Sequence, residues 1–293
     1  MNLQQLKTKL VTAAMIAATI PVVAQVEVNY EKYPDYALPT RGDKTLMIRK
    51  GDAKKTRPVR VNNAANKHFP TIFNQDGGSC GSASRISYMF TYEINALRNA
   101  DASLPENIYP SHFTWLLTNS GSSKDQMAIA NGIPNIEVYG GRTYSSLFGN
   151  QDCSDNDFGW MQGYDKWYSA MFNRLGSTAN FPVSVESEEG REAVKNWLWN
   201  HNGDEDFAAG GICGIGVASG GVWLRIPNSS KNRELGVNGK YYVGSWGQQV
   251  DHALTIVGYD DEIEFDLDGN GVAGEKEKDE AQSCPHSLRP HGL

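Results

Sequence analysis

Three residues in this sequence have side chains suited to nucleophilic chemistry on a carbonyl group. Cys80 follows two glycines in the stretch FNQDGGSCGSAS, directly before a segment with helical periodicity. A thiol in the first turn of a helix meets the positive end of the helix dipole, which favours the thiolate form. His252 begins the apolar segment HALTIVGY and is a candidate base, because a nucleophile and its base can lie far apart in sequence. Gln75 precedes Cys80, and its amide can donate to an oxyanion together with the Cys80 N–H.

Together these segments resemble the papain-like cysteine peptidases. FNQDGGSCGSAS resembles the family's approach to its nucleophile, and VDHALTIVGYDD resembles its histidine strand. Two further segments, LPENIYPSHFTWLL and AIANGIPNIEVYGGRTYS, fall in the family's order, so the resemblance spans residues 69–265. It implies a secreted thiol endopeptidase that hydrolyses peptide bonds, with Cys80 as nucleophile, His252 as base and Gln75 in the oxyanion hole.

The sequence also departs from the family pattern. Positions 77 and 81 are glycines, where the family has a second cysteine and a tryptophan. An alternative alignment places Cys80 on the family's earlier, disulfide-forming cysteine and Ala83 in the position of the nucleophile, which would make the protein inactive. No Asn-containing strand of the NSWG kind follows His252. We therefore expect that activity is impaired and that the sheet lacks a strand.

The elements that position these residues fall into two groups. A single helical stripe is predicted from apolar residues three or four apart, namely Ala83, Ile86, Phe90, Ile94 and Leu97. Ser79 is expected to cap this helix. Further helices are expected over 169–176 and 191–201, and strands over 211–219, 221–226, 240–246 and 252–259. Helices followed by strands predict an α+β fold with two lobes. The resemblance implies a papain-like helical lobe followed by an antiparallel β lobe, with one or more C-terminal strands missing.

The two ends of the chain differ in residue composition from its middle. Lys7 and Lys9 precede the apolar run LVTAAMIAATIPVVA, which predicts a signal peptide over 1–24 and a secreted or periplasmic protein without a membrane span after its removal. Residues 25–62 are polar and basic and are expected to be a linker or short pro-segment. The peptidase domain is expected over 63–280, followed by an atypical tail over 281–293.

A second chemical motif lies near the end of that domain. Residues 266–277, DLDGNGVAGEKE, match the spacing D-x-[DN]-x-[DN]-G-x5-E of a calcium-binding loop. Oxygen ligands are expected from the side chains of Asp266, Asp268, Asn270 and Glu277 and from the carbonyl of Val272. The sequence thus predicts a structural Ca²⁺ site. An acidic surface turn without a metal ion is the alternative.

Composition limits the partners of the protein. The formal net charge is −7, and the sequence contains no basic stripe, which argues against a nucleic-acid partner. A peptide or protein substrate is expected instead. The four cysteines, Cys80, Cys153, Cys213 and Cys284, include no CxxC pair and give no zinc motif. If Cys80 is a free thiol, at most one disulfide forms within the chain.

Two other functions fit parts of the same sequence. Gly77 to Gly81 also satisfies G-x-S-x-G, the nucleophile elbow of α/β-hydrolases, with Ser79 as a serine nucleophile. The lack of the Asn strand fits instead a catalytically inactive, calcium-stabilised binding or adhesion module. Labelling of Cys80 or Ser79 distinguishes the two enzymes, and a hydrolysis assay distinguishes both from the binding module.

Overall fold

The computed structural model describes the chain from residue 57 onwards, with gaps. The described residues are 57–75, 78–117, 125–139, 161, 163–176, 185, 187–273 and 288–291. The chain divides into residues 1–33 and 34–293, and every described residue belongs to the second unit. The expected signal peptide over 1–24 lies outside the described residues, as do Cys153, Cys284 and Glu277.

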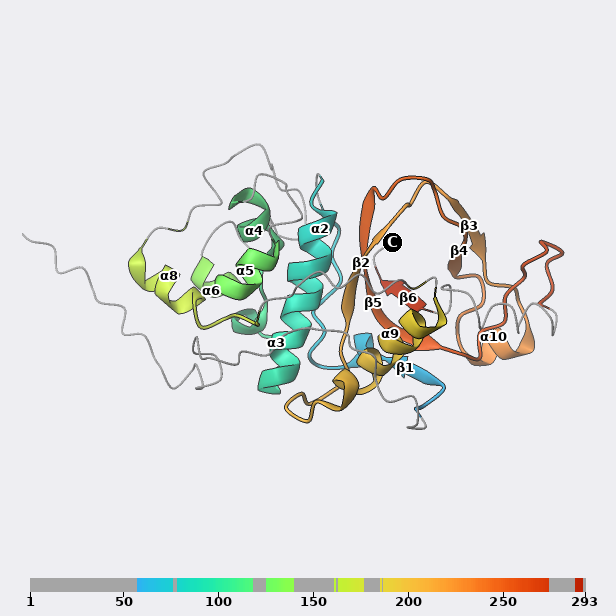
Figure 1. Cartoon of the computed structure of the whole chain (residues 1–293), viewed down its shortest axis with the longest axis horizontal. Helices are drawn as coiled ribbons and strands as arrows, with labels where there is room; N and C mark the ends of the chain where they lie inside the picture. Colours follow the sequence, from blue (N-terminus) through green and yellow to red (C-terminus); the bar gives the residue numbers. More distant parts are fainter. Residues whose placement is uncertain are drawn as a thin grey trace, which may run out of the picture. The chain divides into compact units, whose positions relative to one another are not determined.

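A long helix begins at Cys80 and lies between a group of short helices and the strands (Figure 1). It consists of three consecutive segments, α2 (Cys80–Ser82), the wider π-type η4 (Ala83–Phe90) and α3 (Thr91–Arg98). The predicted apolar stripe is confirmed, because four of its members are almost fully buried and Leu97 is partly buried. All of the stripe except Ala83 packs with the helical part of the molecule and belongs to its core.

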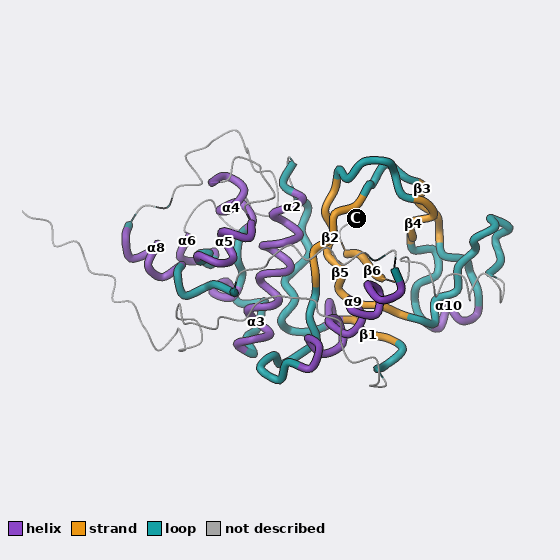
Figure 2. Tube along the Cα trace, viewed as in Figure 1, coloured by secondary structure: helices purple, strands orange, loops and turns teal. Residues whose placement is uncertain are grey.

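Short helices pack on one side of the long helix (Figure 2). They are η5 (Pro105–Asn107), α4 (Ser111–Leu117), α5 (Asp125–Asn131), α6 (Ile136–Tyr139) and α8 (Tyr164–Ala170). Their shared core includes Phe90, whose ring meets that of Tyr109 edge-on at a centroid distance of 5.0 Å. We refer to this half as the helical lobe.

The helix expected over 169–176 was wrong in its position, because α8 ends at Ala170. Local backbone bonds continue only as far as Asn173 N, which donates to Ala170 O, and the backbone is also bonded to other elements. Leu175 N donates to Ile129 O at 3.0 Å, and the Arg98 guanidinium donates to a carbonyl of the same loop at 2.8 Å. These long-range bonds satisfy groups that a helix would have paired locally.

Antiparallel strands lie on the other side of the long helix (Figure 2) and form what we call the β lobe. The main sheet contains β1 (Arg60–Asn62), β2 (Cys213–Val217), β5 (His252–Asp260) and β6 (Leu288–His291), with β5 paired to the other three. A second sheet pairs β3 (Val222–Arg225) with β4 (Tyr241–Ser245). The lobe also contains α9 (Glu188–Asn200), η8 (His201–Gly203) and α10 (Ser230–Glu234). The four strands expected over 211–259 and the helix expected over 191–201 are confirmed.

The sheet extends beyond the strands that the sequence predicted. β1 lies within 25–62, which was expected to be a linker, and it pairs with the far end of β5. β6 lies in the tail over 281–293, where no strand was expected, and it also pairs with β5. Strands as short as β1 and β6 carry too little alternation to be recognised in sequence, and β6 also contains Pro290. Pairing with β5 therefore determines their conformation.

The two lobes are joined by a small apolar core and by buried hydrogen bonds. Tyr92 on α3 packs with Ile212 and Val257 from the β lobe, and its hydroxyl donates to the Gly210 carbonyl at 2.7 Å. These contacts fix the long helix against β2 and β5.

The chain is therefore an α+β protein, as the order of its elements predicted. No helix within the described segments is both long enough and apolar enough to cross a bilayer.

Candidate active site

Cys80 is the first residue of the long helix, as the glycine-rich approach predicted. Ser79 occupies the N-cap position, and its carbonyl accepts the first helical bond from Ala83 N at 2.8 Å. The Ser79 side chain makes no capping hydrogen bond, so the expected cap was wrong. The Cys80 thiol is free and partly exposed. It thus combines solvent access with the positive end of a helix of more than four turns.

His252 is the first residue of β5 and pairs with Val217 on β2. Its side chain is partly exposed, whereas the strand that follows is buried from Leu254 to Asp260. The apolar run anchors the strand in the core, and the imidazole lies at its open end. This is the position that the sequence predicted for a base at a strand terminus.

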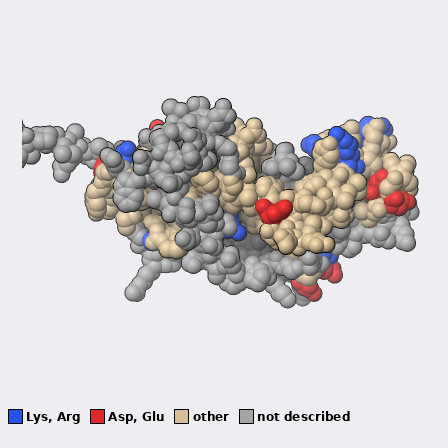
Figure 3. All heavy atoms as spheres, turned by 90° about the horizontal axis from the view of Figure 1, so that it is seen from above, with Lys and Arg blue, Asp and Glu red and all other residues tan. Residues whose placement is uncertain are grey.

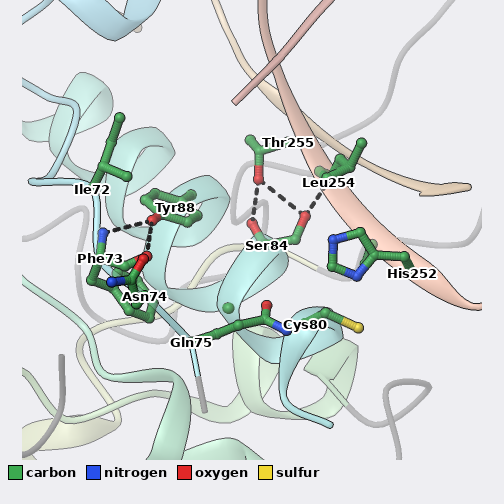
Figure 4. Close-up of a pocket in the computed structure, with 12 residues that line it drawn as sticks. Ile72, Phe73, Asn74, Gln75, Cys80, Ser84, Tyr88, His252, Leu254 and Thr255 are labelled. Carbon is green, nitrogen blue, oxygen red and sulfur yellow. Dashed lines mark hydrogen bonds between the residues drawn. The ribbon is translucent and has the colours of Figure 1, made fainter. Parts of the chain in front are cut away.

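Cys80 and His252 line one pocket between the two lobes. The pocket has a volume of about 390 Å³. Its lining comes from the segment before the helix, the first turns of the helix and the start of β5, namely Ile72, Phe73, Asn74, Gln75, Cys80, Ala83, Ser84, Tyr88, His252, Ala253, Leu254 and Thr255. In Figure 4 the His252 ring and the Cys80 thiol lie on the same side of this pocket.

Gln75 lines the same pocket from the extended segment before the helix. Figure 4 shows its amide end directed toward Cys80. The three predicted site residues are therefore brought to one pocket, although His252 is distant in sequence from the other two. An amide beside the thiol is placed to donate to an oxygen that develops negative charge there.

The surroundings of the His252 ring include the charge of the adjacent Asp251. Within the described residues, neither this ring nor the Cys80 thiol makes a hydrogen bond to another side chain. The adjacent Asp251 accepts from Ser219 N at 2.7 Å, and this hydrogen bond holds the pKa of Asp251 below its usual value. β6 contains no Asn, and its register on β5 places His291 opposite Thr255 rather than opposite His252.

The two alternative nucleophiles are less favourably placed. Ser79 is only 1% exposed and does not line the pocket, and the described strands pair antiparallel, whereas a nucleophile elbow follows a strand of a parallel sheet. Ala83, the nucleophile position of the alternative alignment, lines the pocket but is 3% exposed and lies a turn deeper than Cys80. Both observations favour Cys80.

No Lys, Arg, Asp or Glu is found among the described residues that line the pocket. Apolar groups and neutral hydrogen-bonding groups surround the thiol instead. On the described part of the face shown in Figure 3, acidic and basic groups form separate small patches.

The predicted calcium loop is described only in its first part, over 266–273. The Asp266 carboxylate accepts from the backbone N–H groups of Gly269, Asn270 and Gly271 at 2.9, 3.0 and 2.6 Å. Gly271 has a φ of 86°, the left-handed conformation that the motif requires at its glycine. Among described residues there is no group of three or more His, Cys, Asp or Glu that could hold a metal, and Glu277 is not described.

Sequence inspection missed two hydroxyl groups in the pocket. Ser84 Oγ donates to Leu254 O at 2.6 Å, and Thr255 Oγ1 lies 3.0 Å from Ser84 Oγ. Ser84 follows Cys80 by four residues, so helical spacing alone places it on the same face as the thiol. The sequence contained no comparable signal for its partner on β5.

Comparison of the chain with family models, with curated proteins and with solved structures found no match.

Proposed function

We propose that this protein is a secreted or periplasmic thiol endopeptidase of the papain-like type. The observation that supports this proposal most strongly is that one pocket is lined by Cys80, His252 and Gln75. A free thiol, a strand-end imidazole and a side-chain amide are the groups that acyl transfer from a peptide requires.

The proposed reaction begins with proton transfer from the Cys80 thiol to His252. The thiolate attacks the peptide carbonyl carbon, and the Gln75 amide and the Cys80 N–H donate to the resulting oxyanion. His252 then returns the proton to the leaving amine as the C–N bond breaks, which leaves a thioester on Cys80. Water, activated by His252, hydrolyses the thioester and releases the carboxylic acid product.

The test is hydrolysis of fluorogenic peptides by the full chain and by three variants. We expect that Cys80→Ala and His252→Ala each abolish turnover, and that Ser79→Ala, which alters a buried hydroxyl outside the pocket, retains most of it. Equal turnover by wild type and Cys80→Ala would refute the thiol mechanism. Loss of activity with Ser79→Ala, together with fluorophosphonate labelling of that serine, would support the serine alternative.

A catalytically inactive binding module is the second candidate. It is favoured by one observation, the absence of a described side chain that orients the His252 ring. If wild type and Cys80→Ala both fail to hydrolyse peptides while both remain folded, this candidate replaces the peptidase.

We further propose that residues 266–277 bind Ca²⁺ as a structural ion. Supporting this proposal are the matched spacing and the turn at Gly271. Asp266, Asp268 and Asn270 supply hard oxygen atoms that suit this ion, and Glu277 completes the motif.

A further inference from the structure

We propose that Ser84 and Thr255 are positioning residues that set the placement of the Cys80 thiol relative to the His252 ring. Their hydroxyl groups form the hydrogen-bonded contact between the nucleophile helix and the histidine strand inside the pocket. Figure 4 shows this contact beside the two reactive side chains. The inference rests on the proposed function of the same pocket.

The contact lies close to both reactive groups along the chain. Ser84 is one helical turn beyond Cys80, and Thr255 is three residues beyond His252 on β5. The carbonyl of Leu254, two residues from His252, accepts the Ser84 hydroxyl proton at 2.6 Å. A shift of the helix along the strand would therefore displace the thiol relative to the imidazole by a similar distance.

The number of hydroxyl protons determines the direction of the bonds. Each hydroxyl has one proton, and the Ser84 proton is donated to the Leu254 carbonyl. The Thr255 hydroxyl is then the donor to Ser84. Its acceptors there are Ser84 Oγ at 3.0 Å and the Ser84 carbonyl oxygen at 3.1 Å. The side chain and carbonyl of Ser84 on the helix are thus bonded to the Leu254 carbonyl and the Thr255 side chain on β5.

Burial protects this arrangement from water. Ser84 is 3% exposed and Thr255 is 1% exposed, so water does not readily replace either bond. The bonds to Leu254 O and to Thr255 Oγ1 therefore hold the Ser84 hydroxyl in the position that joins the helix to β5.

The experiment measures the rate of Cys80 alkylation by iodoacetamide as a function of pH in the full chain, with the modified peptide identified by mass spectrometry. Thr255→Val removes the hydroxyl but keeps the shape of the side chain, and Thr255→Ser restores it. Ser87→Ala is the matched control, because Ser87 is a buried hydroxyl on the same helix whose Oγ accepts from Ser111 N within the helical lobe.

In wild type we expect alkylation of Cys80 to persist at about pH 6, because a thiolate paired with imidazolium reacts there. We expect Thr255→Val to lower that rate about tenfold or more while leaving the rate at about pH 9 within about twofold, since misplacement by an ångström can cost as much as a hundredfold. Thr255→Ser should restore the wild-type profile, and Ser87→Ala should lower thermal stability without changing the profile.

The outcomes separate this inference from the proposed function. A wild-type profile without reaction at about pH 6 refutes the Cys80–His252 pair itself. A wild-type profile with that reaction, unchanged in Thr255→Val, refutes the positioning role alone. Failure of Thr255→Val to fold, or an equal effect of Ser87→Ala, also refutes it, because the hydroxyl would then serve stability rather than placement.

Discussion

The Asp125 carboxylate provides a quantitative test of the packing behind the first turns of the long helix. Asp125 begins α5 and is fully buried, and its Oδ1 accepts from Ser82 Oγ at 2.7 Å. Its Oδ2 has no hydrogen-bond partner in the described part of the chain, and Arg85 Nη1 lies 3.9 Å from it. Burial raises the pKa of Asp125 from 3.8 to about 6, and the Ser82 bond and the Arg85 charge offset this only in part.

The sign of the pH dependence follows from this shift. Between pH 3.8 and about 6 the folded state holds a proton that the unfolded state has lost, so the stability contributed by this group falls as pH rises through that window. About two pH units at about 1.4 kcal/mol each correspond to a cost of about 3 kcal/mol above pH 6. Asp125→Asn removes the charge and keeps an acceptor for Ser82.

We therefore expect Asp125→Asn to be more stable than wild type by about 1 to 3 kcal/mol at about pH 8 and by much less at about pH 4. Urea denaturation of both proteins at about pH 4, 6 and 8 measures the difference. A difference that does not change with pH, or a wild type that is the more stable protein at about pH 8, would show that Asp125 is not held as a buried acid.

Three further predictions concern stability. Glu93→Gln should lower the free energy of unfolding by about 1 to 3 kcal/mol in urea denaturation, because the carboxylate contacts both His201 Nε2 at 2.5 Å and Ile212 N at 2.7 Å, and an amide with one acceptor oxygen leaves one of these buried groups without an acceptor; an unchanged free energy of unfolding would contradict this. Phe90→Ala should cost about 3 to 5 kcal/mol, because the ring is 0% exposed at the centre of the helical lobe; near-wild-type stability would place the core elsewhere. Ca²⁺ at about 100 times its dissociation constant should add about 2.7 kcal/mol to wild type and markedly less to Asp266→Asn, as measured by melting with and without chelator; an equal response would refute the calcium loop.

The sequence predicted the positions of Cys80 and His252 in the fold better than it predicted the elements around them. Cys80 and His252 are recognisable because each lies at the end of an element with a strong pattern, a helical stripe in one case and an apolar strand in the other. Helix and strand periodicities act over a few residues and are present in the sequence itself. The α+β order of elements was predictable for the same reason.

What the sequence did not predict depends on contacts between distant segments. β6 becomes a strand by pairing with β5, although Pro290 weakens any strand pattern. The loop after α8 is held by bonds to α5 and to the end of α3. Thr255 resembles any other residue of a buried strand until Ser84 is placed opposite it.

The most direct test of the account is the rate of Cys80 alkylation at about pH 6 in wild type and in His252→Ala. If the imidazole and the thiol act as a pair, wild type reacts rapidly at this pH and the His252→Ala rate falls about a hundredfold, toward that of a simple thiol. Equal rates in the two proteins would show that the two side chains line one pocket without acting on each other, and the peptidase mechanism would be wrong.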